Sequence, residues 1–169
     1  DGMVTAGVAK QHDTRLFREQ GLFVMDQAAY VAAVAGIGSG KSRAGAVKAL
    51  LYCVKHPKSL GMVVAPSFPM LRDATLRTIK EVWPEELTKD FHPSEMRMVV
   101  PNGAEVLFRS TDDPDMLRGP NLAWVWMDEA AQSSQESFKV LQGRLRQTGF
   151  PAQLWITTTP KGYNWLYQE

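Results

Sequence analysis

The residues that could do chemistry begin with a glycine-rich stretch from Ala35 to Ser42, AGIGSGKS. It follows a run of small apolar residues, Val31 to Val34, and precedes a helical pattern, so we expect a buried strand, a glycine loop and a helix in that order. Glycines let backbone N–H groups crowd around phosphate oxygens, and the positive end of the helix dipole points at them. In that geometry Lys41 reaches the β- and γ-phosphates of a nucleotide, and the Ser42 hydroxyl holds Mg²⁺.

The stretch departs from the strict pattern G-x-x-x-x-G-K-[ST] at one position, because Ala35 stands where the first glycine is expected. Alanine is acceptable wherever φ stays negative, and the neighbouring Gly36 can supply a left-handed turn. The alternative is a surface loop that happens to end in Gly-Lys-Ser, and the acidic pair described next argues against it. We therefore predict a phosphate-binding loop made of Gly36, Ile37, Gly38, Ser39, Gly40, Lys41 and Ser42.

An acidic pair, Asp128 and Glu129, directly follows the apolar run from Leu122 to Met127, LAWVWM. A run that is apolar at every position is typical of a strand covered by helices on both faces, so Trp124 and Trp126 are expected in the core. Ligands of open α/β sheets bind at the carboxyl ends of strands, which predicts that Asp128 binds or orients Mg²⁺ and that Glu129 polarises the attacking water. A buried acidic pair without such a partner would be costly, which argues against a purely structural role.

Strands and helices alternate along the rest of the chain, which indicates a parallel sheet. Apolar spacing predicts a weak helix within residues 16–29, a helix over 42–55, a strand over 62–65 and a helix over 69–82. Residues 85–95 are polar and irregular, and alternation on both sides of Pro101-Asn102-Gly103 predicts an antiparallel hairpin inserted into the sheet.

The segment after the hairpin ends with one more helix and one more strand. The loop over residues 110–120 carries three aspartates, but it has Pro114 among them and no Ca²⁺-loop spacing, so we expect a solvated turn. Ser133-x-x-Glu136 predicts a capping box for the following helix. The last strand is expected over Leu154 to Thr158.

Length, charge and composition limit the classes of protein to which the chain can belong. The chain of 169 residues fits one domain over 16–169 with a flexible lead-in over 1–15, and 44% hydrophobic content is enough for a sizeable core. The net charge of +1 gives no strong electrostatic footprint for DNA, so any DNA contact must be local or shared between subunits. A single cysteine, Cys53, excludes a disulfide framework and favours a reducing, cytosolic setting. No apolar stretch approaches the length of a membrane span, so we expect a soluble protein without membrane contact.

Three stretches resemble a known family: the glycine loop, Trp124 to Ala130 as WVWMDEA, and Ile156 to Tyr167 as ITTTPKGYNWLY. They are similar to the ATPase domain of the large terminase subunit of tailed bacteriophages, and the third stretch is the most specific of them. The resemblance runs from about Gln20 to the end of the chain. It implies an α/β P-loop NTPase of the additional-strand, catalytic-glutamate class, with a mainly parallel sheet flanked by helices and an antiparallel hairpin insertion.

The resemblance also assigns roles. Lys41 and Ser42 carry the Walker A roles, and Asp128 and Glu129 carry the Walker B roles, with Lys41 and Glu129 counted as catalytic. Three threonines match a coupling motif, whose hydroxyls would sense the γ-phosphate and pass its loss to the parts that grip DNA: Thr157, Thr158 and Thr159.

Two further residues match family positions less directly. Gln20 matches a glutamine that contacts adenine, although a solvated helix glutamine fits the sequence equally well. Arg118 matches an arginine that reaches into a neighbouring subunit's site as a catalytic finger, worth about 10³ to 10⁵ in rate. The alternative for Arg118 is a surface ion pair with Asp115.

By the resemblance, the chain hydrolyses ATP with Mg²⁺ to drive viral double-stranded DNA into a preformed capsid. Its implied partners are double-stranded DNA, the portal protein, the small terminase subunit and further copies of itself in a homo-oligomeric ring. The implied location is the host cytoplasm and, transiently, the procapsid portal. The open alternatives are a helicase-like translocase of the same class, against which the Thr-Thr-Thr-Pro-Lys-Gly stretch argues, and a nucleotide-binding module without turnover, against which Glu129 argues.

Two departures from the family bear on these expectations. Many terminases place an arginine inside the loop where this chain has Ile37, so phosphate charge must be met by Lys41, the metal and a finger. Both ends of the sequence look like cuts, and the family's lid and its RNase H-like nuclease lie beyond the residues given. We therefore expect no DNA cutting from this chain.

Overall fold

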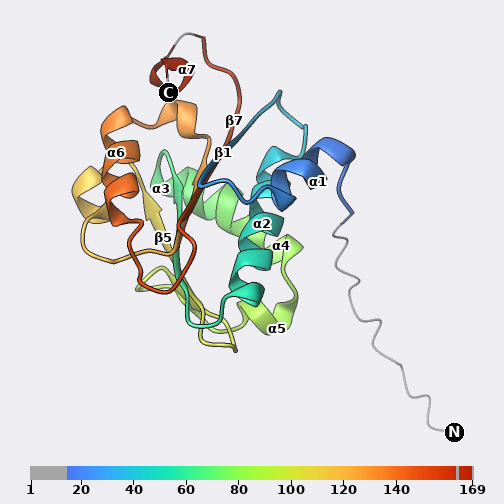
Figure 1. Cartoon of the computed structure of the whole chain (residues 1–169), viewed down its shortest axis with the longest axis vertical. Coiled ribbons are helices and arrows are strands. Elements are labelled where there is room, and N and C mark those ends of the chain that lie inside the picture. Colours follow the sequence, from blue (N-terminus) through green and yellow to red (C-terminus); the bar gives the residue numbers. More distant parts are fainter. Residues whose placement is uncertain (1–14, 163, 169) are drawn as a thin grey trace, which may run out of the picture.

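The computed structural model describes residues 15–162 and 164–168, so nearly all of the predicted lead-in lies outside the described residues (Figure 1). The described strands form one seven-stranded sheet in the order β1-β7-β6-β2-β5-β4-β3. The five strands from β1 to β5 in this order run parallel, whereas β4 and β3 are antiparallel, as the hairpin signal predicts. The strands are β1 (Tyr30–Val34), β2 (Leu60–Ala65), β3 (Phe91–His92), β4 (Arg97–Val99), β5 (Glu105–Ser110), β6 (Trp124–Asp128) and β7 (Gln153–Thr158).

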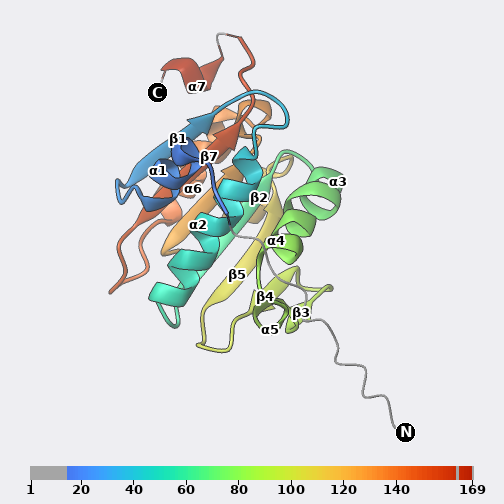
Figure 2. The ribbon, with the colours of Figure 1, turned by 90° about the vertical axis from the view of Figure 1, so that its right-hand side faces the viewer.

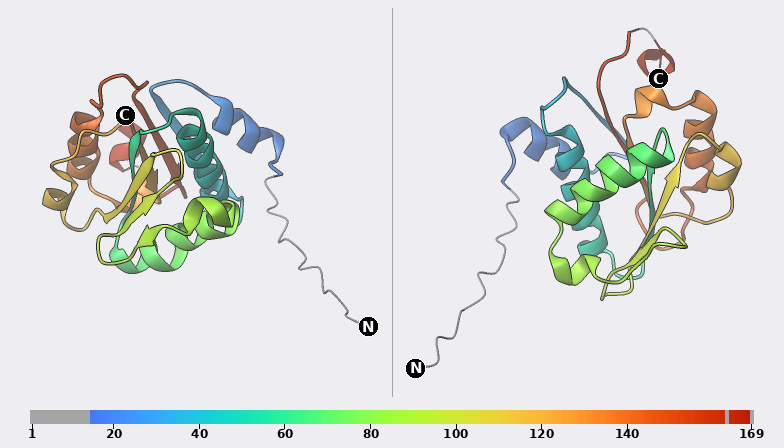
Figure 3. Two further views of the ribbon diagram at one scale, coloured as in Figure 1. Left: turned by 90° about the horizontal axis from the view of Figure 1, so that it is seen from below. Right: turned by 180° about the vertical axis from the view of Figure 1, so that it is seen from behind.

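Helices cover both faces of the sheet, so the expected α/β architecture is confirmed (Figure 2). Helices α1, α2 and α4 lie on one face and α6 on the other (Figure 3). The helical elements are α1 (Arg18–Met25), α2 (Lys41–Lys55), α3 (Phe68–Met70), the π-helix η1 (Leu71–Thr75), α4 (Leu76–Val82), α5 (Glu85–Thr88), the 3₁₀ turns η2 (Pro114–Leu117) and η3 (Ala130–Gln132), α6 (Gln135–Arg144) and α7 (Trp165–Gln168).

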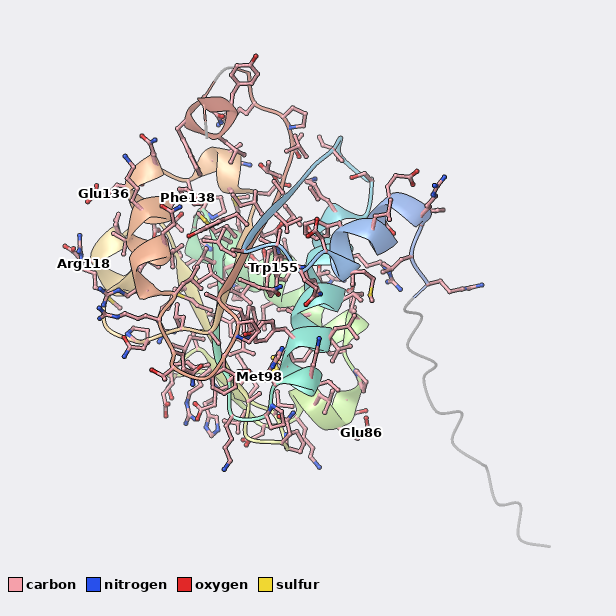
Figure 4. The ribbon with its side chains drawn as sticks, viewed as in Figure 1. Glu86, Met98, Arg118, Glu136, Phe138 and Trp155 are labelled. Carbon is pink, nitrogen blue, oxygen red and sulfur yellow. The ribbon has the colours of Figure 1, made fainter. Side chains whose placement is uncertain are left out.

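The two faces of the sheet carry separate apolar cores. Successive strand residues point to opposite faces, so β6 sends Trp124 and Trp126 towards α2 and sends Val125 and Met127 towards α6. Every residue of β6 is buried, which confirms the expectation of a strand covered on both faces. Figure 4 marks the two sides with Trp155 near α2 and Phe138 on α6.

Two glycines make room for the tryptophans. A Cβ built on Gly61 of β2 would lie 1.8 Å from the Trp124 ring, and one on Gly45 of α2 would lie 2.4 Å from the Trp126 ring. The absence of these side chains lets α2 and β2 approach the indoles closely, and Trp124 also stacks on Trp155 with ring centroids 5.0 Å apart. Both predicted core tryptophans are therefore structural.

The expectation that Val31 to Val34 forms a buried strand is wrong. β1 lies at the edge of the described sheet and alternates between exposed and half-buried residues, with Tyr30 52% and Val34 54% exposed. The reason is the strand order: β7 inserts between β1 and β6, so β1 pairs on one side only among the described strands. Small apolar residues alone do not distinguish a central strand from an edge strand.

Three local expectations also need correction. Residues 85–95 are not irregular throughout, because they form α5 and the short strand β3. The predicted capping box at Ser133 is wrong: helix α6 is capped by Ser134, whose side chain accepts a hydrogen bond from the Ser137 N–H, while Ser133 pairs with Thr111. The helix predicted over 69–82 is present, but the π-helical turn η1 interrupts it.

Candidate nucleotide phosphate site

The glycine loop, the acidic pair and the threonine-rich strand end meet at one edge of the sheet. Their strands are adjacent and in register, because Val34 of β1 pairs with Thr158 of β7, and Thr157 pairs with Asp128 of β6. The carboxyl ends of parallel strands share an edge, which is where ligands of such sheets bind. A cavity of about 520 Å³ opens at this edge, and its lining includes Ile37, Ser42, Ala74, Thr75, Asp128, Glu129 and Thr159.

The glycine loop owes its shape to two glycines in the left-handed region. Gly38 has φ +77° and Gly40, the residue before α2, has φ +76°. Gly36 does not adopt a positive φ, so the expectation that it supplies a left-handed turn is wrong. Ala35 needs no such freedom either, since its N–H donates to the Thr158 carbonyl in continuation of the β1–β7 ladder. This explains why the motif tolerates alanine there.

Lys41 is the first residue of α2 and turns inward. Its side chain is only 9% exposed, and its Nζ lies 3.1 Å from Glu129 Oε1. The N-terminus of the 15-residue helix α2 adds positive electrostatic potential at the same place. The ammonium and the helix terminus thus make the loop a site for an anion such as a phosphate.

Asp128 is buried and accepts three hydroxyl hydrogen bonds. Its Oδ1 accepts from Ser42 Oγ at 2.9 Å and from Thr157 Oγ1 at 2.8 Å, and its Oδ2 accepts from Thr75 Oγ1 at 2.7 Å. Burial raises the pKa of the Asp128 carboxyl, and the three hydroxyls act in the opposite direction. A nearby cation would favour the ionised carboxylate.

Glu129 differs from its neighbour in backbone and surroundings. It sits at φ +49°, ψ +42°, a left-handed conformation that costs a non-glycine residue about 1–2 kcal/mol. Its carboxylate accepts from the Thr159 N–H at 3.2 Å and the Thr159 hydroxyl at 3.3 Å, and it pairs with Lys41. Both carboxylates line the cavity, and Glu129 is the more exposed of the two, since its side chain is 19% exposed whereas Asp128 is 4% exposed.

The three threonines of the strand end have different positions. Thr157 and Thr158 are fully buried, whereas Thr159 lines the cavity. Thr157 accepts from Trp126 Nε1 at 2.8 Å and donates to Asp128, and Thr158 accepts from the Ala131 N–H at 3.1 Å. Of the three threonine hydroxyls predicted to sense a phosphate, only that of Thr159 belongs to a residue that lines the cavity, and the sensing role stays a prediction for all three.

Gln20 lies against the glycine loop rather than on a free helix surface. Its Nε2 donates to the Ser39 carbonyl at 2.8 Å, and its Oε1 accepts from the Phe17 N–H at 2.9 Å. Helix α1, which carries Gln20, is fixed to α2 because the buried ammonium of Lys48 donates to the carbonyls of Phe23 and Val24 at the end of α1. A second cavity of about 330 Å³ between α1 and the loop includes Gln20 in its lining.

Comparisons with known proteins place the chain among its relatives. The family model described as phage terminase large subunit matches residues 27–169. The chain belongs to the phage terminase large subunit family. The PBSX phage terminase large subunit of Bacillus subtilis (strain 168) is 33% identical over 141 residues, and the large terminase subunit of Thermus phage G20c is 31% identical over 156 residues. These matches cover 80% and 79% of this terminase chain and 32% and 31% of the relatives, so the chain spans about a third of their length.

Solved structures show the same fold. The large terminase ATPase domain of Thermus phage P74-26 superposes with a TM-score of 0.73 at 24% identity, over 91% of this chain and 68% of that one. The large terminase of a thermophilic bacteriophage, in complex with ADP, gives a TM-score of 0.75 at 16% identity, over 90% of this chain and 41% of that one. The SWI2/SNF2 ATPase core of Sulfolobus solfataricus gives a TM-score of 0.61 at 13% identity, over 88% of this chain and 32% of that one. The strand order with β7 between β1 and β6 fits the additional-strand class of P-loop folds.

Arg118 lines neither the phosphate cavity of the terminase chain nor the cavity beside Gln20. It follows η2, lies beside Glu136 on the α6 side and is 55% exposed (Figure 4). Its Nε pairs with Asp115 Oδ1 at 3.0 Å, which is the alternative that the sequence left open. The finger role of Arg118 therefore stays a prediction.

The residues present fit a Mg²⁺ ion. The Ser42 hydroxyl and the Asp128 carboxylate bring two hard oxygen donors within 2.9 Å of each other, beside a loop shaped for phosphates. Mg²⁺ is usually held by one or two carboxylates together with substrate phosphates rather than by a full protein cage. The described ranges contain no cluster of three or more histidine, cysteine, aspartate or glutamate side chains that could hold a metal alone.

None of the described helices is long and apolar enough to cross a membrane.

Sequence reasoning missed one member of the site, Thr75. It is 2% exposed and donates to Asp128 from a helix that carries no nucleotide-binding motif. The available signal was a threonine on an otherwise apolar helix face, between Leu71 and Ile79. A buried hydroxyl needs a partner, but the sequence alone does not say which one.

Proposed function

We propose that this chain is the ATP-hydrolysing motor domain of a phage large terminase and that hydrolysis drives viral double-stranded DNA into a preformed capsid. The observation that carries the proposal is the Lys41–Glu129 ion pair lying directly beside the Ser42–Asp128 hydrogen bond. A phosphate-binding lysine, a metal-binding hydroxyl and two carboxylates in separate surroundings are the parts that hydrolysis of a nucleoside triphosphate needs.

The binding step follows from the loop. The amides of the glycine loop and the N-terminus of α2 cradle the β- and γ-phosphates, and Lys41 donates to their oxygens. The phosphates then compete with Glu129 for the Lys41 ammonium, which lies 3.1 Å from the Glu129 carboxylate. Phosphate binding therefore frees Glu129 from its cationic partner. Mg²⁺, when bound to Ser42 and Asp128, neutralises phosphate charge.

The chemical step belongs to Glu129. The freed carboxylate accepts a proton from a water molecule, whose oxygen attacks the γ-phosphorus as the bond to the β–γ bridging oxygen breaks. The products are ADP and inorganic phosphate, and the proton leaves Glu129 afterwards. Thr159 holds the carboxylate through its N–H and its hydroxyl, so it aims the base during this step.

Coupling to DNA starts at the same residues. Glu129 begins the turn η3, which is tied to the segment after β7 because Asn164 Nδ2 donates to the Ala131 carbonyl and Trp165 Nε1 donates to the Ser133 carbonyl. We propose that loss of the γ-phosphate shifts Glu129 and Thr159 and that these contacts pass the shift on.

The partners follow from the family. Two relatives are named as large terminase subunits, and one structural neighbour is described as an ATPase core in complex with double-stranded DNA. We propose double-stranded DNA, the portal protein, the small terminase subunit and further copies in a ring as partners, in the host cytoplasm and at the procapsid portal. We propose that Gln20 reads the adenine edge, that Arg118 completes a neighbour's site, and that these residues alone cut no DNA.

Steady-state ATP hydrolysis across a range of protein concentrations, with and without Mg²⁺ and double-stranded DNA, tests this proposal. Lys41→Ala is the blank. We expect turnover above the blank, dependence on Mg²⁺ and a rate per subunit that rises with concentration. Turnover that does not exceed the Lys41→Ala blank under any of these conditions would contradict the proposal.

The role of Arg118 needs a matched variant. Arg146 is another exposed arginine, bonded to Asn121, and serves as the control. Arg118→Ala should lower the rate in the concentrated sample by about 10³-fold or more, the range of known arginine fingers, and Arg146→Ala should leave it unchanged. A rate per subunit that is independent of concentration and insensitive to Arg118→Ala would refute the finger.

A further inference from the structure

Thr75 contacts the site from an element outside the three motifs. It ends the π-helix η1, between α3 and α4. Its hydroxyl donates to Asp128 Oδ2 at 2.7 Å, and its side chain is 2% exposed. The neighbouring Ala74 lines the phosphate cavity, so this helix forms one wall of the site.

The backbone around Thr75 is unusual. The Leu76 N–H bonds to the Leu71 carbonyl, five residues back, which widens one turn of an otherwise regular helix. Leu71 and Leu76 pack into the core on either side of Thr75, which is the polar residue on that buried face. Single π turns inside helices occur frequently at functional sites. The wide turn lets the apolar neighbours stay buried while Thr75 reaches the carboxylate.

The other two hydroxyls that donate to Asp128 bond to a different carboxylate oxygen from the one that Thr75 bonds to. Trp126 Nε1 can only donate, and it donates to Thr157 Oγ1, so the Thr157 proton is directed to Asp128 Oδ1. Ser42 donates to the same oxygen. Both of these bonds act on Oδ1, whereas Thr75 holds Oδ2. A carboxylate fixed at one oxygen can still turn, and a bond to the second oxygen sets its plane.

We propose that Thr75 is a positioning residue that orients the Asp128 carboxylate towards Ser42 and the Mg²⁺ that accompanies the nucleotide. This inference rests on the proposed function. Partners that orient a metal-binding carboxylate typically change metal affinity or activity by about 10- to 100-fold when they are removed. Thr75 also makes the helix from Phe68 to Val82 part of the site, because a shift of this helix would turn Asp128.

The test measures metal-dependent binding rather than turnover. An ATP analogue with a fluorescent ribose substituent is bound to the chain, and Mg²⁺ is titrated. Thr75→Val removes the hydroxyl and keeps the shape, and it should raise the half-saturating Mg²⁺ concentration about tenfold. Analogue binding without Mg²⁺ should stay within about twofold of wild type, and Thr75→Ser should restore the wild-type metal dependence, because its hydroxyl can make the same bond.

Thr111→Val is the matched control. Thr111 is a buried threonine that bonds to Ser133 outside the phosphate cavity, so its loss should lower the melting temperature without altering the Mg²⁺ titration. Should Thr75→Val fail to fold, Thr75→Ala must show the same metal effect. A Thr75 variant that lowers the melting temperature but keeps the wild-type Mg²⁺ dependence would overturn the inference alone. A wild-type chain whose analogue binding ignores Mg²⁺ would overturn the proposed function as well.

Discussion

The glycine loop between β1 and α2 is built to hold its ligand with backbone groups, whereas the opposite side of the cavity is built from side chains. The loop follows an edge strand whose residues are partly exposed, and its shape comes from Gly38 and Gly40 at positive φ. The Asp128 side lies between fully buried stretches of β6 and β7, where three hydroxyls converge on one carboxylate.

The two sides of the cavity should tolerate different substitutions. A site made of backbone groups depends on φ and ψ and tolerates most side-chain substitutions. A site made of side chains depends on hydrogen bonds between buried groups. Trp126 joins the two sides, because its ring lies against Gly45 of α2 and its Nε1 donates to Thr157, which in turn donates to Asp128.

Asp128→Asn should have the largest effect of the changes that separate the two sides. The amide keeps the size of the side chain but removes the negative charge that faces the metal, so turnover should fall by about 10²-fold or more. Asp90→Asn, at an exposed aspartate that pairs with His92, is the control for the turnover assay. An Asp128→Asn chain that turns over ATP at the wild-type rate would remove Asp128 from the mechanism.

Gly45→Ala probes the connection between the two sides. The new Cβ would lie 2.4 Å from the Trp126 ring, so α2 or the indole must move, at a cost of about 1–3 kcal/mol. Thermal unfolding should show a melting temperature lower by about 2–10 °C. Gly143→Ala in α6 is the matched control, because a Cβ there meets nothing within 4 Å and alanine favours a helix. Equal melting temperatures for the two variants would mean that the close contact between α2 and Trp126 does not matter.

Gly38→Ala and Gly36→Ala test the backbone side with a smaller expected effect. A Cβ meets nothing within 4 Å at either position, so only φ distinguishes them. Alanine at the positive φ of Gly38 should cost about 1–2 kcal/mol, or roughly five- to thirtyfold in affinity for an ATP analogue. Gly36→Ala should stay within about twofold of wild type. Titration of the fluorescent analogue checks both, and a reversed order would show that the loop binds nucleotide in another conformation.

Much of the fold follows from local sequence patterns. The apolar run before Asp128, the glycine loop and the Asn102-Gly103 hairpin each carry their signal within a few residues, and the structure confirms their secondary structure. The position of the acidic pair beside the glycine loop can also be predicted from the sequence, because the carboxyl ends of parallel strands meet at one edge of the sheet.

The remaining features depend on contacts between distant residues. Strand order places β1 at the edge, and no property of Tyr30 to Val34 encodes that. The inward position of Thr75 depends on a single wide turn, and the burial of Thr157 depends on Trp126 from the neighbouring strand. The adenine role of Gln20 and the finger role of Arg118 stay predictions.

The proposed role of Glu129 is tested most directly by comparing nucleotide binding and ATP turnover in Glu129→Gln. In the proposed mechanism Glu129 transfers the proton, whereas the loop and Lys41 bind the phosphates. The variant should therefore bind the fluorescent ATP analogue in the presence of Mg²⁺ at least as well as wild type. Its steady-state ATP turnover should fall by about 10²- to 10⁴-fold, the usual contribution of a general base. Turnover within a fewfold of wild type would show that Glu129 is not the base.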